Sequence, residues 1–156
     1  MKNKTLYISI VYLLFLFLAI NQEGQSQLMF PIKIKWKTLK DVKFTEKFNK
    51  EYDATFLYPT FGANIKKLEG KIVELTGYAI PIEQNYYVLS AASMASCFFC
   101  GAAGPESIVQ LNFTKKTRLK TDQIITVQGT LKLNPDNIDD LNYIFDQAII
   151  VQKTEN

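Results

Sequence analysis

The fold prediction depends first on the stretch of residues 70–82, GKIVELTGYAIPI. Apolar and polar side chains alternate along it with the period of two that is typical of a half-buried β-strand. One side carries Val73, Leu75, Gly77 and Ala79, and the other carries Ile72, Glu74, Thr76 and Tyr78. Gly77 has no side chain and lets such a strand bend, and Pro81 interrupts it near its end. We therefore expect one long, bent strand here.

Four more strands are expected after this one, over residues 86–91, 107–113, 124–133 and 143–152. Polar turns at 83–85 and 134–137 separate them, and no long amphipathic helix pattern lies between them. Five strands would close a flat sandwich poorly, whereas they suit a small closed barrel of the oligonucleotide/oligosaccharide-binding (OB) type. The sequence therefore predicts a mainly β protein with an OB-like five-stranded barrel over residues 70–153.

The N-terminal region has the layout of a secretory signal peptide, which we expect to cover residues 1–26. Lys2 and Lys4 precede a mostly apolar run from Leu6 to Ile20, and a polar stretch follows. The run of about fifteen residues is shorter than the roughly 20 that a membrane-spanning helix needs. Cleavage before Gln27 would leave a mature chain with no membrane span that works outside the cytoplasm. A retained N-terminal membrane anchor is the alternative.

Residues 27–69 are expected to pack on the barrel as an N-terminal strand, a loop and a short helix. From Phe30 to Phe44, apolar side chains alternate with lysines, which predicts an edge strand with one lysine-bearing face. The charged stretch 45–53 carries no clear pattern. Residues 56–62 include a proline and are expected to form an extended loop that leads into a helix over residues 63–68.

The chemistry of the chain is concentrated in SCFFCG, residues 96–101, because the chain has two cysteines and no histidine. The segment falls between the second and third barrel strands. One interpretation is a disulfide between Cys97 and Cys100, which an exported location favours. Another is a metal site for Zn²⁺ or Cu(I), in which Glu106 and Met94 would add ligands to the two thiolates.

Two further interpretations of Cys97 and Cys100 stay open. Their spacing is that of thiol–disulfide exchange proteins. The segment lacks the helix that usually stabilises the attacking thiolate, and Phe98 and Phe99 make its surroundings apolar, which raises the pKa of a thiol. The remaining interpretation is a pair of reduced thiols that only pack.

The charge and the aromatic residues of the chain give weaker indications of its function. The formal net charge is +3, and the one arginine, Arg118, lies in a short basic run that we interpret as a solvated loop. Nucleic-acid binding is therefore not expected.

Tyr78, Tyr86 and Tyr87 would form an aromatic face of the kind that such barrels use for bases or sugars, although strand tyrosines also serve as packing residues.

Several motifs together resemble a family of small exported bacterial proteins of unknown function. They are W36-x-x-L39, L68-E-G-K-x-V-x-L-x-G-Y-x-x-P81, C97-x-x-C100-G with Pro105, and Gly129. The resemblance spans most of the mature chain. It implies a protein in the periplasm of a Gram-negative bacterium, where a retained leader would anchor it to the inner membrane. Members are often encoded beside ABC-transporter components and are in some cases linked to zinc handling. Other members can carry histidine in the cysteine segment, and this chain departs from them there.

The leading hypothesis is a non-enzymatic periplasmic accessory protein. It would bind a metal ion or an ABC-transporter subunit through the part of the barrel that carries Cys97 and Cys100. The alternatives are a thiol–disulfide redox protein that uses the same two cysteines and an OB-type binder of oligonucleotides or sugars.

Overall fold

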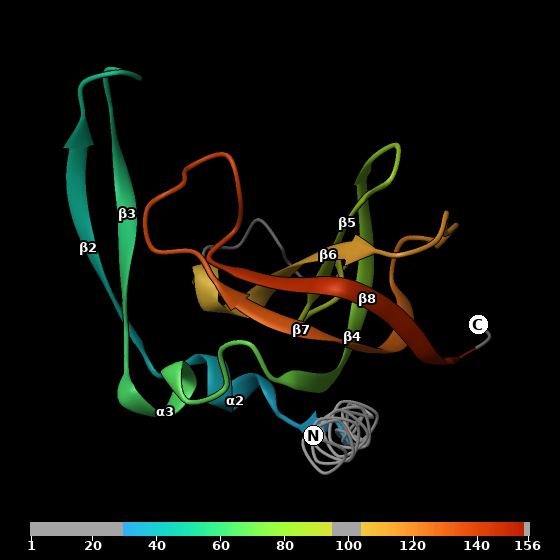
Figure 1. The fold of residues 1–156 in the computed structure, drawn as a ribbon. Helices are drawn as coiled ribbons and strands as arrows, with labels where there is room; N and C mark the ends of the chain where they lie inside the picture. Colours follow the sequence, from blue (N-terminus) through green and yellow to red (C-terminus); the bar gives the residue numbers. More distant parts are fainter. Residues whose placement is uncertain (1–29, 95–103, 155–156) are drawn as a thin grey trace, which may run out of the picture.

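The computed structural model describes residues 30–94 and 104–154. In this part the chain is mainly β, with a closed five-stranded barrel, an extra strand on it, two short helices and a separate β-hairpin (Figure 1). The fold class predicted from the sequence is thus confirmed. The predicted signal peptide, residues 1–26, lies outside the described residues. No helix in the described ranges has the length and apolar character needed to cross a membrane.

The barrel strands follow the predicted ones within one or two residues. They are β4 (Ile72–Glu83), β5 (Tyr86–Ser90), β6 (Ile108–Phe113), β7 (Gln123–Leu133) and β8 (Tyr143–Lys153). Strands β4, β5 and β6 pair antiparallel in order, and β7 returns to lie beside β4, which is a Greek-key connection. β8 lies between β6 and β7, parallel to β6 and antiparallel to β7, and completes the barrel.

Strand β4 closes the barrel because it is long enough to pair with two barrel neighbours. Residues 72–79 pair with β7, and residues from Tyr78 to Glu83 pair with β5. Gly77 lies where these pairings meet. A Cβ atom there would lie 2.6 Å from the carbonyl oxygen of Ser90 and 2.8 Å from the Trp36 ring, so a larger residue would push both away. Glycine is thus required at this position by close approach.

Alternating side chains of the strands fill the barrel interior. The core includes Val73, Leu75, Ala79, Leu89, Val109, Leu111, Ile125, Val127, Leu131 and Phe145. The side of residues 70–82 that carries Val73, Leu75 and Ala79 is thus the one that faces the barrel interior. Burial of such side chains supplies the main driving force for folding.

The edge strand predicted from Phe30 to Phe44 is wrong. The chain forms a short strand β1 (Ile32–Lys33) parallel to β4, then the helix α2 (Trp36–Leu39), and then a new strand. Trp36 and Leu39 are three residues apart, so a helical turn puts both on one face, whereas a strand would put them on opposite faces. The Trp36 indole Nε1 donates to the carbonyl of Thr76 at 2.9 Å, and Leu39 is fully buried.

The next segments form a hairpin that the sequence did not reveal. Strand β2 (Val42–Asn49) pairs antiparallel with β3 (Ala54–Phe61) along its full length. Figure 1 shows the hairpin extending away from the barrel. The loop expected at 56–62 is therefore mostly strand, and Pro59 is tolerated because β3 belongs to a two-stranded sheet. Helix α3 (Ala63–Lys66) confirms the predicted helix in a shorter form.

The two ends of the hairpin are joined at its base through Asp41. Its carboxylate Oδ2 accepts hydrogen bonds from the backbone N–H groups of Asn64 at 2.9 Å and Ile65 at 3.1 Å, and so caps the start of α3. Gly62 donates its N–H to the Asp41 carbonyl at 2.8 Å. A side chain at Gly62 would collide with the Asp41 carboxylate, so glycine is needed for this contact.

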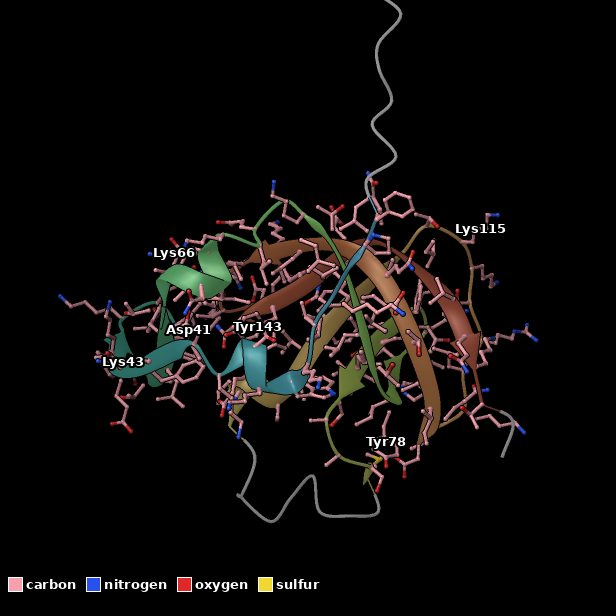
Figure 2. The ribbon with its side chains drawn as sticks, turned by 90° about the horizontal axis from the view of Figure 1, so that it is seen from below. Asp41, Lys43, Lys66, Tyr78, Lys115 and Tyr143 are labelled. Carbon is pink, nitrogen blue, oxygen red and sulfur yellow. The ribbon has the colours of Figure 1, made fainter. Side chains whose placement is uncertain are left out.

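Tyr143 attaches this base to the barrel (Figure 2). Its side chain is fully buried, its hydroxyl donates to the Leu39 carbonyl at 2.6 Å, and its ring makes an edge-on contact with Phe61 at 5.4 Å between centroids. Burial raises the pKa of Tyr143, and the nearby carboxylates of Glu106 and Asp41 raise it further. The phenol therefore remains a neutral donor in the fold.

Replacing Tyr143 with Phe should lower the free energy of unfolding by about 1–3 kcal/mol, because the buried Leu39 carbonyl loses its donor. Urea denaturation followed by circular dichroism measures the change. Tyr86→Phe is the matched control, since the Tyr86 hydroxyl makes no hydrogen bond to the described residues, and it should be nearly neutral. Equal losses in the two variants would contradict the assigned bond.

Alkaline pH should destabilise the protein through Tyr143. Its pKa in the folded state lies above the unfolded value of about 10, so its contribution to stability is full below pH 10 and is lost as the pH rises above it. Denaturation midpoints measured between about pH 9 and pH 11 should fall more steeply for the wild type than for Tyr143→Phe. Parallel curves would show that other groups cause the loss.

Candidate functional site

The structure tests the predicted sulfur site only at its flanks. Cys97 and Cys100 lie outside the described residues, so the disulfide, metal and redox interpretations stay predictions. Met94 donates its backbone N–H to the Asp122 carboxylate at 2.6 Å. Glu106 belongs to the 3₁₀ helix η2 (Pro105–Ser107) and acts on Tyr143 through its charge. Within residues 30–94 and 104–154, no group of three or more His, Cys, Asp or Glu side chains is placed to hold a metal.

The three tyrosines of the expected aromatic face do not lie on one surface. Tyr87 points into the barrel core, where its hydroxyl donates to the Thr117 carbonyl at 2.8 Å. Tyr78 and Tyr86 lie on the outer side of the strands, because successive residues of a strand face opposite ways and Tyr78 is paired with Ser90. Partial burial raises the pKa of Tyr86, with smaller effects from Asp140 and Glu83.

The outer face of β6 is covered by the loop of residues 134–142 between β7 and β8. Gln110, only 6% exposed, donates to the Asp140 carboxylate at 2.8 Å and accepts the N–H of Leu141 at 3.0 Å. Asn134, also buried, donates to the carbonyls of Asn137 and Asp140. These bonds hold the loop in one conformation over a face that OB barrels commonly leave open for ligands.

A cleft lies between this loop and the β2–β3 hairpin. Its volume is about 150 Å³, and it is lined by residues 56–59 of β3 and by Pro135, Asp136, Asn137, Ile138, Asp140, Leu141 and Asn142. Towards the hairpin tip, the charge of Asp139 in the loop raises the pKa of Tyr52 between the two hairpin strands. At the hairpin base the two walls meet through the ring contact of Phe61 with Tyr143. The cleft is therefore bounded at the hairpin base.

The cleft is acidic and apolar. Among the described residues, Asp136 and Asp140 are its charged lining residues, and no lysine or arginine lines it. The two carboxylate oxygens of Asp140 accept hydrogen bonds from Gln110 and Asn137, which are neutral amides and add no positive charge. The apolar side chains beside it suit the aliphatic stem of a cationic side chain.

The hairpin also exposes apolar side chains on one face. The cross-strand pairs Glu46–Leu57 and Phe48–Thr55 place Leu57 and Phe48 diagonally on that face, where they are 47% and 60% exposed. This surface is not evident in the sequence, because the charged stretch 45–53 obscures the alternation of its side chains. Phe44, Glu46 and Phe48 nevertheless alternate with Thr45 and Lys47, and this pattern was the available signal.

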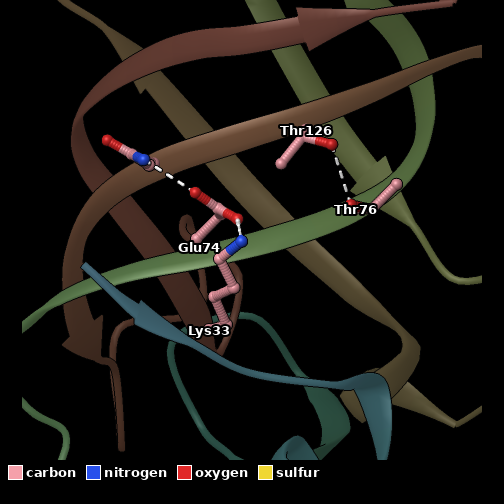
Figure 3. A network of polar contacts seen from close by, with 5 residues as sticks. Lys33, Glu74, Thr76 and Thr126 are labelled. Atoms are coloured by element: carbon pink, nitrogen blue, oxygen red, sulfur yellow. Dashed lines mark hydrogen bonds and ion pairs between the residues drawn. The ribbon is translucent and has the colours of Figure 1, made fainter.

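A polar network on the outer face of β4 has a structural role (Figure 3). Glu74 forms an ion pair with Lys33 of β1 at 3.5 Å and accepts a hydrogen bond from Gln128 of β7 at 2.7 Å. Thr76 and Thr126 share a hydrogen bond of 2.8 Å beside it. The network joins β1, β4 and β7 and fixes how they are aligned.

Comparison with models of known protein families gives no match for this chain, and no curated protein matches it.

Proposed function

We propose that the protein is a non-enzymatic binding protein that holds a partner polypeptide on its β2–β3 hairpin. The cleft beside β3 binds one cationic side chain of the partner. The observation that carries this proposal is the acidic and apolar cleft next to the exposed apolar face of the hairpin.

The size and charge of the cleft define what it accepts. Pockets for small molecules usually measure about 300–1,000 Å³, so a cleft of about 150 Å³ accommodates one side chain rather than a whole ligand. Lysine and arginine combine an apolar stem with a charged end. The stem contacts Phe56, Pro59 and Leu141, and the charged end faces Asp136 and Asp140.

The exposed apolar face supplies the remaining contact area. Phe48 and Leu57 lie on the hairpin surface next to the cleft, and Leu57 also lines it. Large apolar side chains that are exposed together commonly mark interaction surfaces. A few such side chains at the centre of an interface provide most of its binding energy.

Both walls of the cleft are fixed before binding. Asp41 and Tyr143 hold the hairpin base, and Asn134 and Gln110 hold the loop. A preformed site loses little conformational entropy when the partner binds, and this strengthens the complex.

The resemblance of residues 68–81 to exported proteins encoded beside ABC-transporter components supports a transporter subunit as the partner. It also supports the periplasm as the place where the two meet. This part of the proposal rests on the resemblance, whereas the cleft and hairpin are properties of the fold.

Labelled peptides with one lysine or arginine between leucines are the probes for this proposal, and fluorescence anisotropy measures their affinity. Leu57→Ser should weaken binding about tenfold, since removal of a central apolar contact commonly costs more than 1 kcal/mol. Asp136→Asn should weaken it about threefold, the usual range for an exposed charge pair. The controls are Ile82→Ser and Glu69→Gln, which alter similar exposed side chains outside the cleft lining and should bind as the wild type does.

Two results would count against the proposed function. One is equal affinity for a peptide in which glutamate replaces the cation. The other is an equal loss of binding in Ile82→Ser and Leu57→Ser. Either result would show that the cleft does not select its ligand.

A further inference from the structure

A second hollow lies between the β6–β7 loop and the last residues of β8. Its volume is about 420 Å³, and its lining consists of residues 113–118 with Ala148, Ile149, Ile150 and Lys153. Figure 2 shows Lys115 of this loop at the opposite side of the molecule from Lys43 of the hairpin and Lys66 of α3. The hollow is therefore separate from the cleft of the proposed function.

The hollow exists because the pairing of β6 with β8 ends early. Phe113 pairs with Ala148, and the N–H of Thr114 still donates to the Ala148 carbonyl at 3.3 Å. After this point the β6–β7 loop leaves β8, which continues to Lys153 in pairing with β7 alone. The barrel surface therefore opens between the loop and β8.

Hydrogen bonds hold the loop in place. Tyr87 donates its hydroxyl from the barrel interior to the Thr117 carbonyl at 2.8 Å. The Thr117 hydroxyl donates to the Lys115 carbonyl at 2.9 Å, and the N–H of Lys120 donates to the Gln123 side chain at 3.4 Å. The positions of the basic residues on this loop are therefore set by the fold.

The hollow is strongly basic. Lys115, Lys116, Arg118 and Lys153 line it, and none of the residues 30–94 and 104–154 that line it is acidic. The ion pair found in the described part of the chain joins Lys33 to Glu74, so these four cations have no ion-pair partner there. Several like charges around one hollow produce a positive potential that attracts anions. Arg118 adds a planar group that matches the oxygen atoms of a phosphate.

Exposed apolar side chains lie beside these charges. Ile149 lines the hollow and is 48% exposed, and Val151, two residues further along β8, is 44% exposed. A small soluble anion would leave such side chains in water. A membrane surface combines anionic phosphates with an apolar layer beneath them, and proteins bind it through basic and apolar residues together.

We propose that this hollow binds the phosphate headgroup of an anionic phospholipid, and that Ile149 and Val151 rest on the apolar layer of the membrane. The basic residues supply the attraction, and the apolar residues set the depth of contact. This site is independent of the cleft and of the partner proposed for it.

The test is sedimentation of the full chain with vesicles of phosphatidylcholine, with or without phosphatidylglycerol. The test variant carries Lys115→Gln, Lys116→Gln and Arg118→Gln. The matched control carries Lys43→Gln, Lys66→Gln and Lys67→Gln, which removes the same charge from exposed positions on the hairpin and at the end of α3. Residues 1–29 are identical in all three proteins, so their own affinity for membranes cancels in the comparison.

The wild type should prefer the anionic vesicles. Each basic residue at such a surface contributes about 1 kcal/mol, and about 1.4 kcal/mol corresponds to a tenfold change in affinity. The loss of three basic residues should therefore weaken binding of the test variant to these vesicles roughly a hundredfold. The control variant should bind like the wild type. Added salt should weaken the wild type most, because it screens exposed charges. Unchanged thermal unfolding in both variants shows that they are folded.

Three outcomes would overturn the proposal. Equal losses in the test and control variants would indicate attraction to net charge without a site. Calorimetric binding of free glycerol phosphate, with no preference for anionic vesicles, would assign the hollow to a soluble phosphate compound. Tighter binding of a thymidine oligonucleotide than of the vesicles, lost in the test variant, would assign it to single-stranded nucleic acid.

Discussion

The buried hydrogen bond from the Tyr143 hydroxyl to the Leu39 carbonyl joins the two parts of the described structure. Tyr143 is the first residue of β8, and Leu39 ends α2, directly before the hairpin. The Tyr143 ring also contacts Phe61, the last residue of β3. One side chain therefore connects the barrel to the residues on both sides of the hairpin. The loop that forms the second wall of the cleft leads directly into Tyr143. The contact of Tyr143 with Phe61 therefore also holds the loop wall next to the hairpin wall at the hairpin base.

The two sites have opposite electrostatic character. The cleft beside the hairpin presents aspartates among apolar side chains, whereas the hollow beside β8 presents lysines and an arginine. Figure 2 places the residues of the hairpin and of the basic loop on opposite sides of the molecule. The proposed membrane site and the proposed polypeptide site therefore lie on opposite sides of the molecule. The net charge of the whole chain is only +3, so composition alone does not reveal that acidic and basic residues gather at separate sites.

The barrel was predictable because its strands bury one face each, so the pattern of period two appears in residues 70–82 and 124–133. The N-terminal region was less predictable. The turn of α2 is set by Trp36 and Leu39 packing on the barrel, and this contact depends on residues far away in the sequence. The cleft is formed by residues 56–59 and 135–142, which no local pattern connects. Cys97 and Cys100 remain the chemical feature that the sequence alone describes.

The joined base of the hairpin has a consequence for how such a protein can diversify. Asp41 and Gly62 are hydrogen-bonded at 2.8 Å, so the chain leaves the barrel region and returns to it at nearly the same point. Residues can therefore be added to or removed from the tip at little cost to the barrel, because loop-closure entropy changes slowly with length. The hairpin is in this sense an exchangeable part. A hairpin of a different length would present a different surface on the same scaffold.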